Sequence, residues 1–158
     1  MPKNTVPRQQ AVRNCLLLIE LKEKTMNRQE LEKITHQWIS LWNAPGDWEL
    51  FDQLHADDFE DCSPAGRPNT KEAYIGDIKS ILEIFPDLTI QVDDMVVDME
   101  RQRVAVRWSA EGTNRVKFLG VGPTNRKTPI TGIEIIEIRN GQIIKRWGEW
   151  DISAHTAQ

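Results

Sequence analysis

The sequence predicts an α+β domain in which a curved antiparallel sheet wraps around a long N-terminal helix, as a cone-shaped α+β barrel. Apolar residues recur every three or four positions up to Phe85, which is the period of an amphipathic helix. From Leu88 onward they recur every second position, which is the period of a strand. The pair Asn140-Gly141 then favours a two-residue hairpin turn. Helices followed by antiparallel strands are typical of domains whose helices cover one face of the sheet.

Three helices are expected before Pro86, which cannot continue a helix. Asp47 and Thr70 are suitable N-caps for a short second helix and for a third one, because their side-chain oxygens can accept hydrogen bonds from unpaired backbone N–H groups. The first helix runs from Asn27 to about Asn43, and its apolar stripe consists of Leu31, Ile34, Trp38, Leu41 and Trp42.

Two strands follow, from Leu88 to Val97 and from Val104 to Gly112. The alternation of the second strand turns Trp108 toward the helices, and the same parity brings Asn114 inward. A sheet curved around a helix leaves a cone with a pocket at its open end. Trp38, Trp42 and Trp108 are expected chiefly as core residues that border this pocket.

The register of the hairpin around Asn140-Gly141 determines which side chains share a face of the sheet. With Arg139 opposite Gln142, an uninterrupted register pairs Glu134 with Trp147. Three carboxylates then share one face with Trp147, namely Glu134, Glu149 and Asp151. The opposite face carries Thr131, Ile133, Ile135, Ile144 and Trp150. Either the acidic face points to water, or it lies inside the curved sheet and lines the pocket.

Length and composition restrict the class of protein. A chain of 158 residues with 39% hydrophobic residues suits a globular domain with a core, and a net charge of -4 with mixed signs argues against nucleic-acid binding. No stretch approaches the length of a membrane span, because the apolar run at 15–19 is broken by Glu20. A cytoplasmic location is the expectation, since two cysteines form no disulfide framework.

The domain is expected at residues 26–158, preceded by a basic arm at 1–25 that could be helical from Gln9 to Glu23. No metal site is predicted, because no cysteine or histidine has metal-ligand spacing. The histidines His36, His55 and His155 are expected at the surface or at element boundaries.

From Met26 to Asp151 the chain resembles the SnoaL-like polyketide cyclases, predicted ester cyclases of the nuclear-transport-factor-like superfamily, with its cone-shaped barrel. The resemblance rests on fragments in a fixed order, which are LWNAPGDWELFDQLHADDFED at 41–61, IFPDLTIQVDDMV at 84–96, VAVRWSAEGT at 104–113, FLGVGPTNRK at 118–127, TGIEIIEI at 131–138 and NGQIIKRWGEWD at 140–151.

The resemblance implies an acid/base enzyme without metal or organic cofactor that acts on a small apolar carbonyl compound. Asp151 would be the general acid/base of an intramolecular aldol condensation or related lyase or isomerase chemistry, assisted by Glu149, with Glu134 across the hairpin. Carboxylates crowded in an apolar pocket raise one another's pKa, so that one can hold a proton near neutral pH. Asn114 and Cys62 stand where many relatives have histidine, and Asn114 could donate to an enolate oxygen.

Other functions remain open. The alternative to an enzyme is a non-catalytic module of the same fold that holds a small ligand or acts as a dimeric adaptor. A limonene-epoxide-hydrolase-like activity is a lesser possibility, because it requires an Asp-Arg-Asp arrangement and the sequence places no arginine beside Asp151. A homodimer is expected, joined through the sheet face that carries Ile133, Ile135 and Trp150.

Overall fold

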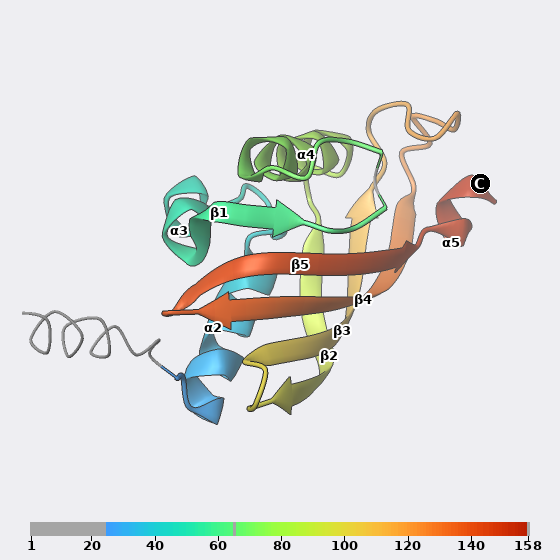
Figure 1. The fold of residues 1–158 in the computed structure, drawn as a ribbon. Coiled ribbons are helices and arrows are strands. Elements are labelled where there is room, and N and C mark those ends of the chain that lie inside the picture. The colour runs from blue at the N-terminus through green and yellow to red at the C-terminus, as the bar shows by residue number, and fades with distance from the viewer. Residues whose placement is uncertain (1–24, 65, 158) are drawn as a thin grey trace, which may run out of the picture.

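The computed structural model describes residues 25–64 and 66–157 (Figure 1). The arm predicted at 1–25 therefore lies outside the described residues, except for Thr25. The elements are α2 (Arg28–Ser40), α3 (Trp48–Leu54), β1 (His55–Asp61), α4 (Lys71–Ile84), β2 (Thr89–Asp98), β3 (Arg103–Thr113), β4 (Lys127–Arg139), β5 (Gln142–Asp151) and α5 (Ser153–Thr156). No helix in these ranges combines the length and the apolar character that crossing a membrane requires.

The predicted helix starts are confirmed by their caps. Asn27 caps α2 in a reciprocal capping box with Glu30, since each side chain accepts a hydrogen bond from the other residue's backbone N–H. The Asp47 side chain accepts from the third residue of α3, and Thr70 does the same for α4. The predicted end of the first helix near Asn43 is three residues late, because regular helix stops at Ser40.

The α+β class and the helix-covered curved sheet are confirmed, and the sheet is open rather than closed. Its strand order is β1-β5-β4-β3-β2, with α2 behind the sheet and α4 beside β1 in Figure 1. Strands β2 to β5 are antiparallel, as expected, whereas β1 pairs with β5 in parallel and makes the sheet mixed. Strand β1 was not predicted from the sequence, because most of its residues are acidic.

The core lies between the helices and the inner face of the sheet. Trp38, Trp42 and Trp108 are buried there, as predicted. Alternation along β3 buries Val104, Val106, Trp108 and Ala110. The Trp42 ring packs edge to face against the aromatic rings of Tyr74 and Trp150.

The predicted hairpin register is wrong beyond Ile143. Asn140 and Gly141 adopt the positive φ values expected of the turn, and Arg139 lies opposite Gln142. The register then shifts by one residue between Ile138 and Glu137, which leaves Ile144 as an extra residue in β5.

This one-residue bulge reverses the faces of β5, because successive side chains of a strand point to opposite sides. Glu134 lies opposite Gly148 rather than Trp147. Glu134 is buried, and Trp150 turns inward with it. Three residues expected beside Glu134 are instead on the outer face, namely Trp147, Glu149 and Asp151. The shared acidic face of the sequence analysis therefore does not form.

Candidate active site

Arg146 of β5 is the centre of a buried polar cluster. It is 2% exposed, and its guanidinium lies between the carboxylates of two other strands. Nε donates to Glu134 Oε2 at 2.7 Å, and Nη1 donates to Asp61 Oδ1 and to Ser63 Oγ, both at 2.9 Å. The bulge makes this possible, because it gives Arg146 the same inward parity as Glu134.

The cluster continues toward the surface as a chain of alternating charges. Arg67 donates to Asp61 and pairs with Asp77 of α4 at 3.1 Å. We call Glu134, Arg146, Asp61, Arg67 and Asp77 the acid–arginine cluster. It leads from the buried face of β4 to the partly exposed side of α4.

Burial and charge act against each other on Arg146. Burial is the largest single effect and would lower its pKa, but the negative charges of Glu134 and Asp61 and the hydrogen bond to Glu134 together outweigh burial and raise the pKa of Arg146 above its ordinary value. The guanidinium also lies 4.8 Å from the ring centre of Tyr74, whose own pKa is raised by burial. Arg146 therefore stays charged and Tyr74 neutral in the folded protein.

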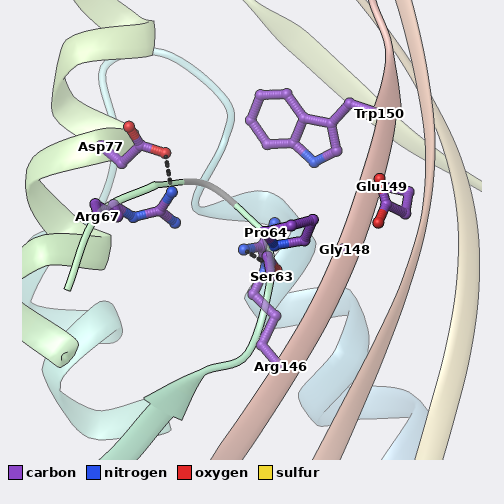
Figure 2. A pocket seen from close by; sticks show the side chains of 8 residues that line it. All are labelled: Ser63, Pro64, Arg67, Asp77, Arg146, Gly148, Glu149 and Trp150. Atoms are coloured by element: carbon purple, nitrogen blue, oxygen red, sulfur yellow. Dashed lines mark hydrogen bonds and ion pairs between the residues drawn. The ribbon is translucent and has the colours of Figure 1, made fainter. Parts of the chain in front are cut away.

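A cavity of about 170 Å³ opens beside the acid–arginine cluster. We call it the Gly148 cavity. Figure 2 shows the Trp150 ring on one side of it and the Arg67–Asp77 pair on another. Its lining residues are Ser63, Pro64, Arg67, Asp77, Arg146, Gly148, Glu149 and Trp150.

The absence of a side chain at Gly148 lets two functional groups pack against the backbone of β5. A Cβ atom on Gly148 would lie 2.6 Å from Arg146 Nη2 and 3.0 Å from the carboxyl carbon of Glu134. Nη2 is the Arg146 nitrogen that makes no hydrogen bond within the described part of the chain. The Glu134 carboxylate is oriented by two donors, since Oε1 accepts from Trp150 Nε1 at 2.9 Å.

The two residues predicted as catalytic lie largely elsewhere. Asp151 lines a wider groove of about 470 Å³ on the outer side, which we call the outer groove. Its lining residues are Arg107, Thr131, Gly132, Ile133, Glu149, Trp150 and Asp151. Glu149 borders both spaces, but Figure 2 shows its carboxylate on the other side of β5 from the Trp150 ring. A hydrogen bond from Ser153 lowers the pKa of Asp151, the opposite of the shift expected in a crowded apolar pocket.

Asn114 is buried, as predicted, but its side chain holds a loop. Nδ2 donates to the Val116 carbonyl at 2.7 Å, and Oδ1 accepts from the Thr124 N–H at 2.8 Å. The backbone of Gly122 passes so close that a Cβ there would lie 2.2 Å from Oδ1. Both groups of the amide are thus used, and the expected bond to an enolate oxygen is not supported.

Cys62 lies outside the predicted pocket, and two histidines are more buried than expected. Cys62 is exposed, because the parity of β1 gives the inward position to Asp61. His55 lies at an element boundary, as predicted, since it follows α3 and begins β1, but it is fully buried, and so is His155. His55 Nδ1 lies 2.8 Å from the Phe51 carbonyl, and His155 Nε2 lies 2.9 Å from that of Phe118.

Sequence reasoning missed Asp61, Arg67 and Arg146 as site residues. Asp61 and Arg146 are 85 positions apart, and β1, which brings them together, was not predicted. No arginine was expected beside Asp151, and the structure places Arg146 between two other acids, Glu134 and Asp61. Over the residues that the structure describes, no group of histidine, cysteine or acidic side chains could hold a metal ion.

An open α+β cone with a polar cavity at its mouth defines a class of small-molecule proteins rather than one reaction. The family model "SnoaL-like polyketide cyclase" matches residues 32–158, and the chain belongs to that family. No curated protein sequence matches it.

Solved structures share the fold. IdmH of Streptomyces antibioticus, a proposed polyketide cyclase, is 27% identical over 80% of this chain and 96% of its own, with a TM-score of 0.70. TsrD of Streptomyces laurentii is 21% identical over 84% and 96%, with a TM-score of 0.73. AclR of Streptomyces galilaeus, a proposed hydroxylase, is 20% identical over 80% and 81%, with a TM-score of 0.70.

Proposed function

We propose that the chain carries out cofactor-independent acid/base chemistry on a small carbonyl compound, in the manner of a cyclase or isomerase, with the Gly148 cavity as its active site. Membership of the cyclase family supports the general class. The observation that carries the assignment is the packing of the Arg146 guanidinium and the Glu134 carboxyl group against the backbone of Gly148, beside a cavity that Arg146 and Gly148 line.

Each group then has a role in enolisation. Arg146 Nη2 donates to the carbonyl oxygen and stabilises the negative charge that this oxygen gains when the neighbouring carbon loses a proton. The Glu134 carboxylate takes that proton and returns it to a carbon or oxygen of the product. Asp61 acts as a positioning residue, since it fixes the guanidinium through Nη1.

A binding module is the second candidate function. Both Glu134 oxygens already accept hydrogen bonds, and both Asp61 oxygens do as well. A ligand would therefore meet an unused donor but no unused carboxylate oxygen, which favours binding over proton transfer. The catalytic role of Asp151 and Glu149 in the outer groove stays an untested prediction.

An acid/base enzyme of this kind exchanges the α-protons of a bound carbonyl compound with solvent, whereas a binding module does not. We expect the protein to accelerate exchange of the methylene protons of methyl acetoacetate in D₂O, followed by proton NMR. Glu134→Gln should abolish the acceleration, and circular dichroism at 25 °C checks that the variant is folded, because the loss of one charge from the buried ion pair with Arg146 lowers its stability. Glu60→Gln, an exposed carboxylate of β1 paired with Lys145, is the matched control and should exchange at the wild-type rate.

Two outcomes contradict the choice of Glu134 as the base, and a third contradicts the enzyme assignment. Full exchange activity in folded Glu134→Gln would exclude Glu134 as the base. Loss of exchange activity in Asp151→Asn would place the active site in the outer groove. If wild-type protein binds the ester but exchanges no proton, the chain is a binding module.

A further inference from the structure

We infer that the loop between β3 and β4 is a docking surface for a lipid bilayer that contains anionic lipids. We call this segment, residues 114–126, the basic loop. The inference is independent of the proposed function, since no residue of the basic loop lines the Gly148 cavity. In Figure 1 the basic loop, drawn in orange, projects beyond the ends of both strands.

The charge of the basic loop is opposite to that of the whole chain. The loop carries Arg115, Lys117 and Arg126, and residues 112–133 contain no aspartate or glutamate, whereas the chain has a net charge of -4. All three basic residues are exposed, and none of them forms an ion pair with a residue that the structure describes. The loop therefore presents three uncompensated positive charges to an anionic surface.

Two apolar side chains are exposed beside these charges. Val116 is 47% exposed and lies between Arg115 and Lys117 in the chain, and Leu119 is 58% exposed. A bilayer binds this combination, because apolar side chains enter the boundary between headgroups and acyl chains while long basic side chains reach the lipid phosphates. Anionic lipids add electrostatic attraction for each basic residue.

Leu119 adopts a backbone conformation that leucine disfavours. Its φ is +48°, in the left-handed region that glycine and asparagine adopt at lower cost. Its side chain gains no burial in return, because the adjacent Phe118 supplies the contacts with the interior and packs edge to face on Phe85. Strain without a packing reason is typical of functional sites.

Hydrogen bonds hold the basic loop in one shape. Phe118 and Val121 exchange two backbone hydrogen bonds of 2.8 and 2.9 Å, and the Asn114 amide bridges the two ends of the loop. His155 Nε2 lies 2.9 Å from the Phe118 carbonyl. The exposed side chains are thus presented on a fixed backbone, so docking costs little ordering entropy.

A bilayer fits this surface better than a protein or a nucleic acid does. A specific protein interface uses about 20–30 residues from each partner, whereas this surface is one projecting loop. A nucleic acid binds basic side chains through its phosphates, but those contacts leave Val116 and Leu119 in water.

The test is co-flotation of the whole chain with phosphatidylcholine vesicles that contain about 30% phosphatidylserine, at low salt. We expect half of the protein to bind at about 1 mM lipid. Binding should weaken about tenfold or more at high salt and with vesicles of phosphatidylcholine alone, because both changes remove the electrostatic attraction.

Leu119→Asn tests the apolar contact. Asparagine suits the left-handed backbone, so the melting temperature should stay the same or rise. Vesicle binding should fall about tenfold, because the apolar side chain is gone. Met99→Gln is the matched control, since Met99 is 37% exposed in the turn at the opposite end of β3 and should be replaceable without effect on binding.

A double variant tests the charges. Arg115→Gln with Lys117→Gln should weaken vesicle binding about tenfold or more, since each basic side chain near an anionic surface contributes a factor of about five. Arg101→Gln with Lys145→Gln removes two exposed charges elsewhere and should bind like the wild type.

Absence of wild-type vesicle binding overturns the inference. Wild-type binding in folded Leu119→Asn or in the folded Arg115/Lys117 double variant also overturns it, because the contact then lies elsewhere in the chain. Tighter binding to single-stranded DNA than to the vesicles would make the basic loop a nucleic-acid surface. The double variant decides the question even if Leu119→Asn does not fold.

Discussion

At the scale of single residues, Arg146 is the counter-charge on which the buried carboxylates around it depend. Its removal leaves Glu134 buried without a counter-charge and leaves Asp61 with Arg67 alone, and breaking a buried ion pair from one side costs about 3–5 kcal/mol. We expect Arg146→Met to lower the free energy of unfolding by that amount in a urea titration monitored by circular dichroism.

Lys145→Met, one residue earlier, is the control for this change. Lys145 pairs with Glu60 at the surface, and its side chain is 40% exposed. Exposed pairs contribute about 0–1 kcal/mol, so the loss should be small. Equal losses in the two variants would show that the acid–arginine cluster is not a stabilising unit.

His55 predicts the response to acid. Burial lowers its pKa from 6.5 to about 4, so the unfolded state binds more protons than the folded state between these values. Stability is then complete above pH 6.5 and falls as the pH drops toward 4, by about 3 kcal/mol at the lower limit.

Urea titrations of wild type and His55→Gln at several pH values in this window measure the effect. The carboxylates titrate alike in both proteins, so the difference isolates the imidazole. If the free energy of unfolding falls with pH in parallel for wild type and His55→Gln, the lowered pKa of His55 is contradicted.

At the scale of elements, local chemistry predicts where helices begin and turns form, whereas register depends on distant contacts. Asp47, Thr70 and the Asn140-Gly141 turn were identified from side chains that act within a few residues. The bulge at Ile144 has no such local signal. It is favoured because it turns Arg146 toward Glu134 and Asp61, and the sequence does not show that these residues meet. Glu134 was therefore found as a site residue, while its true partners were not.

Deleting Ile144 tests the role of the bulge. The deletion restores the uninterrupted register, which turns Arg146 out and Glu149 in. We expect it to abolish cooperative thermal unfolding, because it removes the buried counter-charge and exposes Trp150. Ile144→Val keeps the residue count and should cost only about 0.5–1.5 kcal/mol. A deletion variant that unfolds cooperatively at the wild-type temperature would mean that either register is tolerated.

At the scale of the whole molecule, the helices among residues 25–64 and 66–157 leave the outer face of the open sheet uncovered (Figure 1). Ile133 and Ile135 are 57% and 39% exposed on this face, and Trp147 lies with them under the Arg103 guanidinium. Trp150, which the sequence analysis added to this surface, belongs to the interior. The predicted dimer interface therefore lacks Trp150 and includes Trp147 instead.

We expect a dimer in sedimentation velocity at micromolar concentration, joined sheet to sheet about a two-fold axis. Two-fold symmetry brings each apolar residue near its copy, so a charge at one position is repeated across the interface and repels itself. Ile133→Glu should therefore yield a monomer with an intact fold. Val116→Glu is the control, since Val116 is 47% exposed on the loop between β3 and β4, away from this face. A wild-type monomer, or a dimer that persists in Ile133→Glu, would show that the outer sheet face is not the interface.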